Sequence, residues 1–196
     1  MIRVNREDSV KNLALGVLLS TLLAACSGGG GAETPEDLAR MAFDALKADS
    51  FEPFAGAVPT VADLEEMLED VREKAGEAEY EEGRKWMEGK GGKEAVVANY
   101  IEERREEVKE TRKALAEAVP AIDWSKAEFG GILEDETKRS ERQGIEKVDF
   151  YFHIDCGEVK YAVKIDDCFK ISRGWVTMDG IRYNESRSEG LTERAR

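Results

Sequence analysis

Hydrophobic residues recur at helical spacing in the first half of the chain and alternate with polar residues in the second half. Apolar positions three or four residues apart predict a helix over Pro35–Ala48, a second helix that begins after Thr60, and a helical piece that ends at Gly89. A longer helix is predicted over residues 93–119. Thr34 and Thr60 are each followed three residues later by Asp, which is typical of a capped helix start. The first half of the chain is therefore predicted to be helical.

After Pro120 the spacing of apolar residues changes from helical to alternating. Gly130 and Gly131 predict a bulge or a close backbone approach in the first extended segment. Charged residues dominate the chain after Tyr183, and we expect residues 184–196 to be a loose tail. The expected elements are an extended segment at 126–133, a polar loop at 134–144, a strand at 148–154, a turn at Cys156-Gly157, a strand at 159–171, and one or two short strands between 175 and 183.

Helices followed by antiparallel strands predict an α+β fold, with N-terminal helices packed on a C-terminal antiparallel sheet. We expect a single domain over residues 34–183. Arg104 and Thr111 interrupt the apolar stripe of the helix at 93–119, so we expect that helix to pack on the sheet of its own chain. A coiled-coil dimer through this helix is the weaker alternative.

The N-terminus has the pattern of an export signal. A short basic segment is followed by an uncharged, mostly apolar run over residues 12–25. Its apolar stretch would be a helix of about 20 Å, too short for a hydrocarbon core of about 30 Å. We therefore predict a signal peptide over residues 1–25 and not a membrane span.

The end of this run reads Leu23-Ala24-Ala25-Cys26 and resembles the lipobox of bacterial lipoproteins. The resemblance implies a lipid on the Cys26 sulfur, cleavage before Cys26, and a Gly-rich tether over residues 26–33. More than one acyl chain would make the anchoring to the membrane durable. Ser27, in place of the Asp that favours inner-membrane retention in this group, implies the periplasmic face of the outer membrane. An ordinary signal peptide with an incidental cysteine is the alternative.

The charge of the chain argues against several classes of partner and site. There are 29 Lys and Arg residues against 42 Asp and Glu, which gives a net charge of −13. No basic excess is present to bind the phosphates of a nucleic acid. The single His and the absence of a Cys-x-x-Cys pair make a zinc site improbable, and we expect no cofactor.

The mature chain resembles the nuclear transport factor 2-like group. The resemblance is carried by the opening helix, which ends in Lys47-Ala48-Asp49-Ser50-Phe51, and by the closing segment from Tyr161 to Cys168 and on to Arg173-Gly174-Trp175. It implies a cone-shaped α+β domain whose helices cover one face of a curved antiparallel sheet. The segment from about residue 62 to 119 departs from this pattern because it is longer and more charged.

The aromatic residues of the second half could either line an apolar concavity or simply form the core. We consider Trp124, Phe129, Phe152 and Trp175 for such a pocket, with Tyr161 or Asp167 as a polar group that orients a ligand. Neighbouring strand residues point to opposite faces, so only one of Asp166 and Asp167 could reach it. His153 is expected on the polar face, opposite Lys160, as a surface residue.

A disulfide between Cys156 and Cys168 is permitted in an oxidising compartment. In the expected hairpin, however, the two residues lie about 30 Å apart, whereas a disulfide needs Cα atoms within about 7 Å. The register of the hairpin therefore decides whether Cys156 and Cys168 form a disulfide or stay free.

These observations predict a non-enzymatic binding module for a small ligand or a peptide. An envelope assembly or scaffold protein acting through the charged helix at 93–119 is the alternative. A lyase or isomerase, as the cone-shaped group contains, would need a buried carboxylate or His beside the cavity. The expected partners are the membrane, through the anchor, and a small ligand or another envelope protein.

Overall fold

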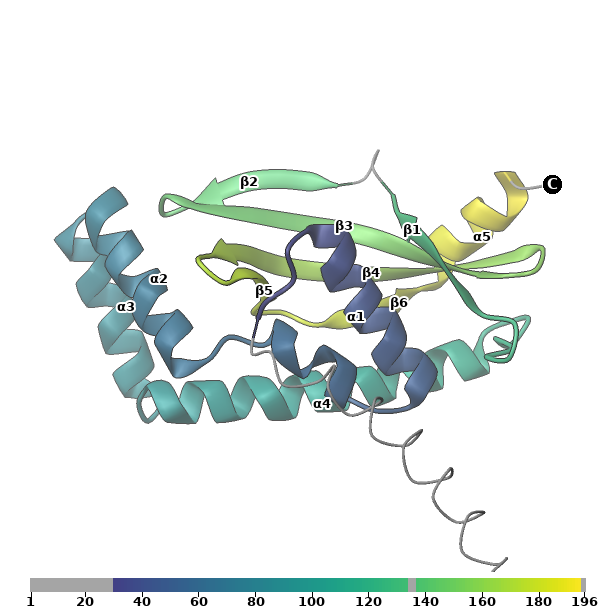
Figure 1. Cartoon of the computed structure of the whole chain (residues 1–196), viewed down its shortest axis with the longest axis horizontal. Coiled ribbons are helices and arrows are strands. Elements are labelled where there is room, and N and C mark those ends of the chain that lie inside the picture. Colours follow the sequence, from purple (N-terminus) through teal and green to yellow (C-terminus); the bar gives the residue numbers. More distant parts are fainter. Residues whose placement is uncertain (1–29, 134–136, 195–196) are drawn as a thin grey trace, which may run out of the picture.

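The computed structural model describes residues 30–133 and 137–194, so Cys26 and the signal segment lie outside the described residues. All its helical elements except the C-terminal one precede a curled antiparallel sheet, which confirms the predicted α+β fold (Figure 1). Within the described ranges, none of the helices has the length and apolar character that a bilayer span requires. The helical elements are α1 (Pro35–Ala48), the 3-10 helix η1 (Glu52–Ala57), α2 (Val61–Lys74), α3 (Glu77–Gly89), α4 (Lys93–Glu117) and α5 (Glu185–Arg194).

The sheet is built on two long central strands. Its main order is β1-β3-β4-β5, with β2 also pairing with β3 and β6 also pairing with β4, all antiparallel. The strands are β1 (Glu128–Ile132), β2 (Lys138–Arg142), β3 (Ile145–Cys156), β4 (Val159–Ile171), β5 (Gly174–Thr177) and β6 (Ile181–Asn184).

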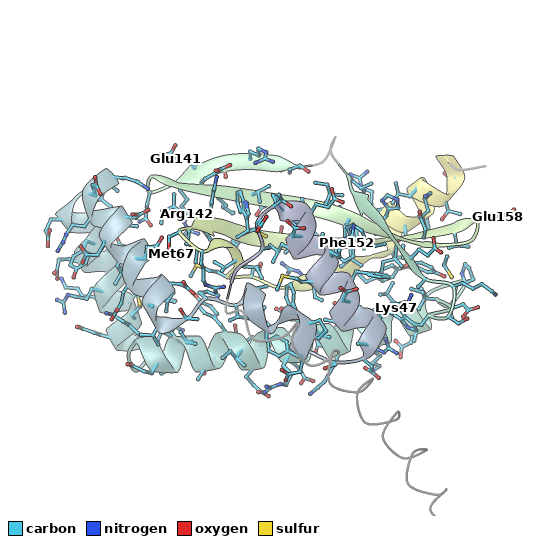
Figure 2. All side chains as sticks on the ribbon, in the orientation of Figure 1. Lys47, Met67, Glu141, Arg142, Phe152 and Glu158 are labelled. Carbon is cyan, nitrogen blue, oxygen red and sulfur yellow. The ribbon has the colours of Figure 1, made fainter. Side chains whose placement is uncertain are left out.

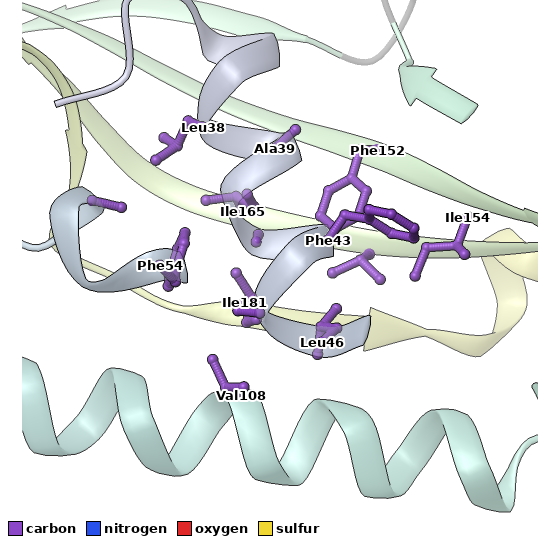
Figure 3. Packing of buried hydrophobic residues seen from close by; sticks show 14 of the residues in the cluster. Leu38, Ala39, Phe43, Leu46, Phe54, Val108, Phe152, Ile154, Ile165 and Ile181 are labelled. Carbon is purple, nitrogen blue, oxygen red and sulfur yellow. The ribbon is translucent and has the colours of Figure 1, made fainter. Parts of the chain in front are cut away.

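The main core lies between α1, α4 and one face of the sheet. Val148, Phe150, Phe152 and Ile154 of β3 are fully buried, which confirms the predicted core face of that strand. The long helix packs on its own chain, against α1 and β6, so its apolar stripe is used internally. Figure 3 shows α1 between β3 and α4, with the labelled core residues Leu38, Ala39, Phe43, Leu46, Phe54, Val108, Phe152, Ile154, Ile165 and Ile181.

Both predicted helix starts are present as capping boxes. The Thr34 hydroxyl accepts from the backbone N–H of Asp37, and the Asp37 carboxylate accepts from the backbone N–H of Thr34. Thr60 and Asp63 form the same arrangement at α2. These reciprocal bonds satisfy backbone donors that the first turn of a helix leaves without partners.

Two segments expected to lack regular structure form elements. Residues 138–142 were expected in a loop but form β2, which pairs with the first half of β3 around a turn at Gln143 and Gly144, both with positive φ. All five β2 side chains are exposed, so no apolar alternation marks the strand. The expected loose tail instead contains α5, which packs on β4.

Polar contacts hold α5 in place. The backbone N–H of Ala162 donates to the Ser188 hydroxyl over 2.8 Å, and that of Lys160 donates to the Thr192 hydroxyl over 3.1 Å. Since α5 is fixed by hydroxyl groups and not by an apolar stripe, its periodicity gave no signal.

The domain also begins earlier than expected. Ala32, placed by sequence in the tether, is buried and exchanges two backbone hydrogen bonds with Trp175 of β5, of 3.1 and 2.6 Å. The folded part of the described chain therefore includes Ala32, two residues before the predicted start at residue 34.

The register of the β3–β4 hairpin differs from the prediction. Cys156 pairs with Val159, so the turn is at Gly157 and Glu158, one residue later than expected. His153 consequently lies opposite Ala162 and not opposite Lys160.

A bulge further along β4 changes which residues face the core. The register shifts between Val148 and Phe150, and Asp167 takes a positive φ of 47°. Cys168 then occupies the inward position, whereas Asp167 was expected to share the phase of Ile165. The predicted inward direction of Asp167 is therefore wrong, because the extra residue reverses the alternation.

Candidate functional site

A hollow of about 400 Å³ lies between α2, α3, the start of α4 and one end of the sheet. We call α2 and α3 together the helical arm (residues 61–89). Figure 2 labels Met67 on this arm and Arg142 on the β2–β3 hairpin, on the side of the molecule where the arm approaches the strand ends. The lining residues are Leu64, Met67, Leu68, Val71, Glu79, Glu82, Gly83, Trp86, Met87, Tyr100, Arg142, Gln143, Ile145, Asp167, Phe169 and Met178.

The apolar wall of the hollow consists of two small clusters that are separate from the main core. Leu64, Leu68, Met87 and Val96 form the first, within the arm and α4. Val71, Ile145 and Phe169 form the second, between the arm and the sheet. Met178 packs against both clusters. The arm thus meets the sheet around a hollow and not through a continuous core.

Two polar side chains lie on the inner side of the hollow. Tyr100 comes from α4, and burial raises the pKa of its hydroxyl, with the nearby Glu103 carboxylate adding to this. Asp167 comes from the β4 bulge, and its side chain is 34% exposed. Lys147 forms a short ion pair with Asp167 and lies 3.4 Å from Asp149. The hydrogen bond to Asp167 raises the pKa of Lys147.

The outer edge of the hollow, which we call the rim, carries charges that are not paired. It consists of Glu79, Glu82 and Trp86 of α3 with Arg142 and Gln143 of the hairpin. Within residues 30–133 and 137–194, Glu79, Glu82 and Arg142 make no ion pair, whereas Arg84 of α3 pairs with both Glu81 and Glu88. Trp86 is 47% exposed, which is unusual for so large an apolar side chain.

Polar contacts attach the base of the arm to the sheet. Arg173, in the turn between β4 and β5, pairs with Asp63 over 2.8 Å and donates to the carbonyls of Gly56 and Val58 over 2.8 and 2.9 Å. The Ser172 backbone and hydroxyl both donate to Glu66, each over 2.6 Å. These contacts join α2 and η1 to the β4–β5 turn.

Most residues proposed for the aromatic pocket pack in or against the main core. Phe152 and Trp175 are buried, and Phe129 packs on Phe152 with 6.0 Å between ring centroids. The Tyr161 hydroxyl donates to the carbonyl of Pro120 over 2.9 Å, and burial raises its pKa to about 12. These residues therefore do not line the hollow. Of the two alternatives that the sequence left open, pocket or core, they belong to the core.

The other two members of the proposed pocket lie apart from each other. The guanidinium of Arg112 lies over the Trp124 ring, 4.7 Å from its centroid, at the edge of the main core. Asp167 does line a hollow, but the one beneath the helical arm. The structure therefore does not bring the six proposed residues together.

His153 is more enclosed than the expected surface residue. Its side chain is 15% exposed and its Nε2 lies 3.4 Å from Asp155. Gly130 of β1 packs so closely on the imidazole that a Cβ there would lie 2.2 Å from the ring, which confirms the predicted close approach and bulge. Burial lowers the pKa of His153. It does not line the hollow.

Cys156 and Cys168 are both free thiols. Cys168 lies opposite Val148, eight residues before Cys156 along β3, so the strands hold the two cysteines far apart. Burial raises the pKa of the Cys168 thiol well above its ordinary value. Among the described residues, no group of three His, Cys, Asp or Glu side chains is placed to hold a metal ion.

Apart from Asp167, the residues around the hollow were not predicted from the sequence as a site. Trp86 and Met87 lie in a helix of mostly charged residues, and Met67 and Leu68 belong to the apolar stripe of an amphipathic helix, so no local pattern marks them as a site. Gly83 of α3 is the one local sign of close packing, since a Cβ there would lie 3.0 Å from Leu68 of α2.

Comparison with known proteins gives no relative. No known protein family matches the chain. No curated protein matches it. No solved structure matches it either. The resemblances to bacterial lipoproteins and to the nuclear transport factor 2-like group therefore stay predictions.

Proposed function

We propose that this protein is a lipid-anchored protein of the bacterial cell envelope that binds a small apolar ligand in the hollow beneath the helical arm. The observation that carries the proposal is the hollow itself, with its two apolar clusters and an inner side formed by Tyr100 and Asp167. A volume of about 400 Å³ lies in the range of roughly 300–1,000 Å³ that small-molecule sites occupy.

The lining combines apolar and polar side chains in the way that is typical of small-molecule binding sites. Apolar side chains supply most of the wall, and a few fixed polar groups are available to orient a ligand. Asp167 is fixed by its bulge, where its backbone N–H donates to Asp149 over 2.8 Å, and by the ion pair to Lys147. Methionines at positions 67, 87 and 178 add polarizable side chains that adapt to irregular shapes.

The enzymatic alternative has little support at this site. A lyase or isomerase of the cone-shaped group would use a carboxylate or His beside the cavity. Asp167 lies there, but it forms an ion pair with Lys147. His153 lies against Gly130, away from the hollow.

The scaffold alternative also has less support. The inner face of α4 is used by its own chain, through residues such as Val108 and Leu115. On its outer face Glu102 pairs with Arg105 and Glu106 with Lys109. The exposed charges of α4 are thus partly paired with one another, which leaves fewer of them to bind a partner.

The anchoring part of the proposal rests on Leu23-Ala24-Ala25-Cys26, which lies outside the described residues. If Cys26 carries the lipid, the five residues 26–30 span at most about 17 Å, since Ala32 is already paired to β5. The domain would then be held close to the bilayer surface. Replacing Cys26 by Ser is expected to release the protein from the membrane fraction and to abolish acyl labelling.

Native mass spectrometry tests the binding part. Residues 27–196 would be produced without the anchor in a bacterial envelope and kept cold during purification. We expect a stoichiometric extra mass of small-molecule size, which Met67→Trp removes by filling the hollow. Met41→Trp is the control, because Met41 is also half-buried but lies on α1 against the main core. A bare mass, or discrete multimers, would instead favour the scaffold.

A further inference from the structure

We infer that the hollow selects a single-chain amphiphile with a cationic head group, its alkyl chain within the hollow and its head at the rim. This inference rests on the proposed function and narrows it to a class of ligand. Three observations carry it: the apolar inner wall, the unpaired carboxylates of the rim, and the exposed indole beside them.

The inner wall is suited to an unbranched alkyl chain. Met67, Leu68 and Val71 of α2 line one side, and Phe169 of β4 with Met178 lines another. An alkyl chain placed among them would contact both apolar clusters, which now meet mainly through Met178. Burying its surface would contribute roughly 25 cal/mol for each Å² removed from water.

The rim carries excess negative charge that the protein does not neutralise. Glu79 and Glu82 are three residues apart on α3 and therefore share one face of the helix. Neither carboxylate makes an ion pair within the described ranges, whereas Glu81 and Glu88 of the same helix both pair with Arg84. Two carboxylates of one helix thus border the hollow without a cation.

The cation that lines the hollow lies on another element. Arg142 borders the hollow from the β2–β3 hairpin, and Lys147 is committed to Asp167 and Asp149. With the Asp167–Lys147 pair set aside, the lining holds two carboxylates, those of Glu79 and Glu82, against the guanidinium of Arg142. The whole chain, at −13, adds a field of the same sign.

Trp86 provides a second feature that favours a cation. It lies on α3, one turn after Glu82, and is 47% exposed at the rim. Five Arg and two Lys side chains of the described chain lie over Phe, Tyr or Trp rings, but none of them lies over Trp86. Indole is the aromatic ring that attracts a quaternary ammonium most strongly.

Calorimetry with three probes of equal chain length tests the inference. Decyltrimethylammonium, decyl maltoside and decyl sulfate would each be titrated into residues 27–196 below their critical micelle concentrations. We expect one site per chain, with the ammonium probe binding about fivefold more tightly than the maltoside, as two exposed charge pairs would give. The sulfate should bind most weakly. Added salt should weaken binding of the ammonium probe and leave the maltoside unchanged.

Two double variants of equal net charge separate the rim from the overall charge of the protein. Glu79→Gln with Glu82→Gln should reduce the ammonium preference to within about twofold. Glu73→Gln with Glu110→Gln, which removes two exposed carboxylates outside the hollow, should retain it. Circular dichroism would confirm that both variants fold.

The outcomes distinguish the two proposals. The cationic preference is overturned if the ammonium and maltoside probes bind equally well, or if both double variants lose the preference for the ammonium probe to the same extent. Either result leaves the hollow as a binding site. If none of the three probes binds, and Met67→Trp has the same native mass spectrum as the parent chain, both the proposed function and the cationic preference are overturned. If the chain forms a dimer and dimer formation blocks the probes, the hollow is the contact site of a second copy, and the inference that it binds an amphiphile is overturned.

Discussion

Replacing Arg173 by Ala is expected to destabilise the protein and to loosen the helical arm. Arg173 is 17% exposed and Asp63 is 6% exposed, so the ion pair between them is largely shielded from water. The substitution would leave the Asp63 carboxylate without its cation and the carbonyls of Gly56 and Val58 without their donors.

The size of the loss follows from these contacts. Removing one partner of a buried ion pair costs about 3–5 kcal/mol, and water can reach part of this site, so we take the lower end, about 3 kcal/mol. For a chain of this length a change of that size lowers the Tm by roughly 6–12 °C. Arg173→Lys should lose about half as much, because an ammonium group cannot reproduce the fork that reaches the carboxylate and two carbonyls.

Urea unfolding followed by circular dichroism measures the free energy. Arg139→Ala is the control, since Arg139 pairs with Glu146 while both are exposed, and should cost at most about 1 kcal/mol. The Arg173→Ala, Asp63→Asn double-mutant cycle should show the two residues to be coupled. If Arg173→Ala cost no more than Arg139→Ala, the arm would not depend on this contact and the reasoning would be refuted.

Four further predictions test other parts of the fold. Gly130→Ala should destabilise by about 1–3 kcal/mol, because its Cβ would overlap the His153 ring, and His153→Ala should restore most of the loss when unfolding is compared. Because burial lowers the pKa of His153, the unfolded chain binds the proton first as the pH falls below about 6.5. Thermal melts should therefore show the parent chain losing more stability than His153→Gln between pH 8 and pH 5, and a pH-independent difference would contradict this. Gly190→Ala, where a Cβ meets nothing within 4 Å, should stabilise α5 by up to about 1 kcal/mol in the same melts. Cys156 should react with a thiol reagent in the native state, whereas Cys168, buried and with its pKa raised, should react only after unfolding.

The elements that sequence reasoning predicted correctly are those whose stability comes from apolar periodicity. The α1 helix and the core face of β3 each have a clear stripe or alternation, and the capping boxes at Thr34 and Thr60 mark their helices within a few residues. Where polar contacts fix the structure, the same reasoning failed. The β2 strand has no buried side chain, and α5 is held by hydroxyl groups.

The bulge at Asp167 shows why the candidate site could not be read from the sequence. Alternation along β4 predicts that the side chain of Asp167 points inward, as that of Ile165 does. One extra residue in β4 instead moves Cys168 into the core and places Asp167 at the hollow. Nothing in the local sequence specifies on which strand an insertion of this kind occurs. The aromatic residues, for which the sequence left a pocket and the core as alternatives, pack in or against the main core.

The hollow itself depends on contacts between segments far apart in the sequence. Its lining comes from the arm, from Tyr100 of α4, and from strands that begin at Ile145 and beyond. Each apolar residue in the lining fits the periodicity of its own helix or strand, so no sequence pattern predicts a cavity between these elements.

The way in which the arm is attached also bears on how a ligand would act. Its base is fixed to the β4–β5 turn by Asp63 and Glu66, through charged hydrogen bonds, while the apolar residues further along it form two clusters with a hollow between them. Apolar surface that faces a hollow contributes less than it would in a continuous core, because it is removed from water only in part. A ligand that fills the hollow supplies the missing contact between the arm and the sheet, and any ligand that binds only the folded state stabilises it in proportion to its affinity. If the hollow binds an apolar chain, as we propose, the incomplete contact between the arm and the sheet would be the physical reason for that binding.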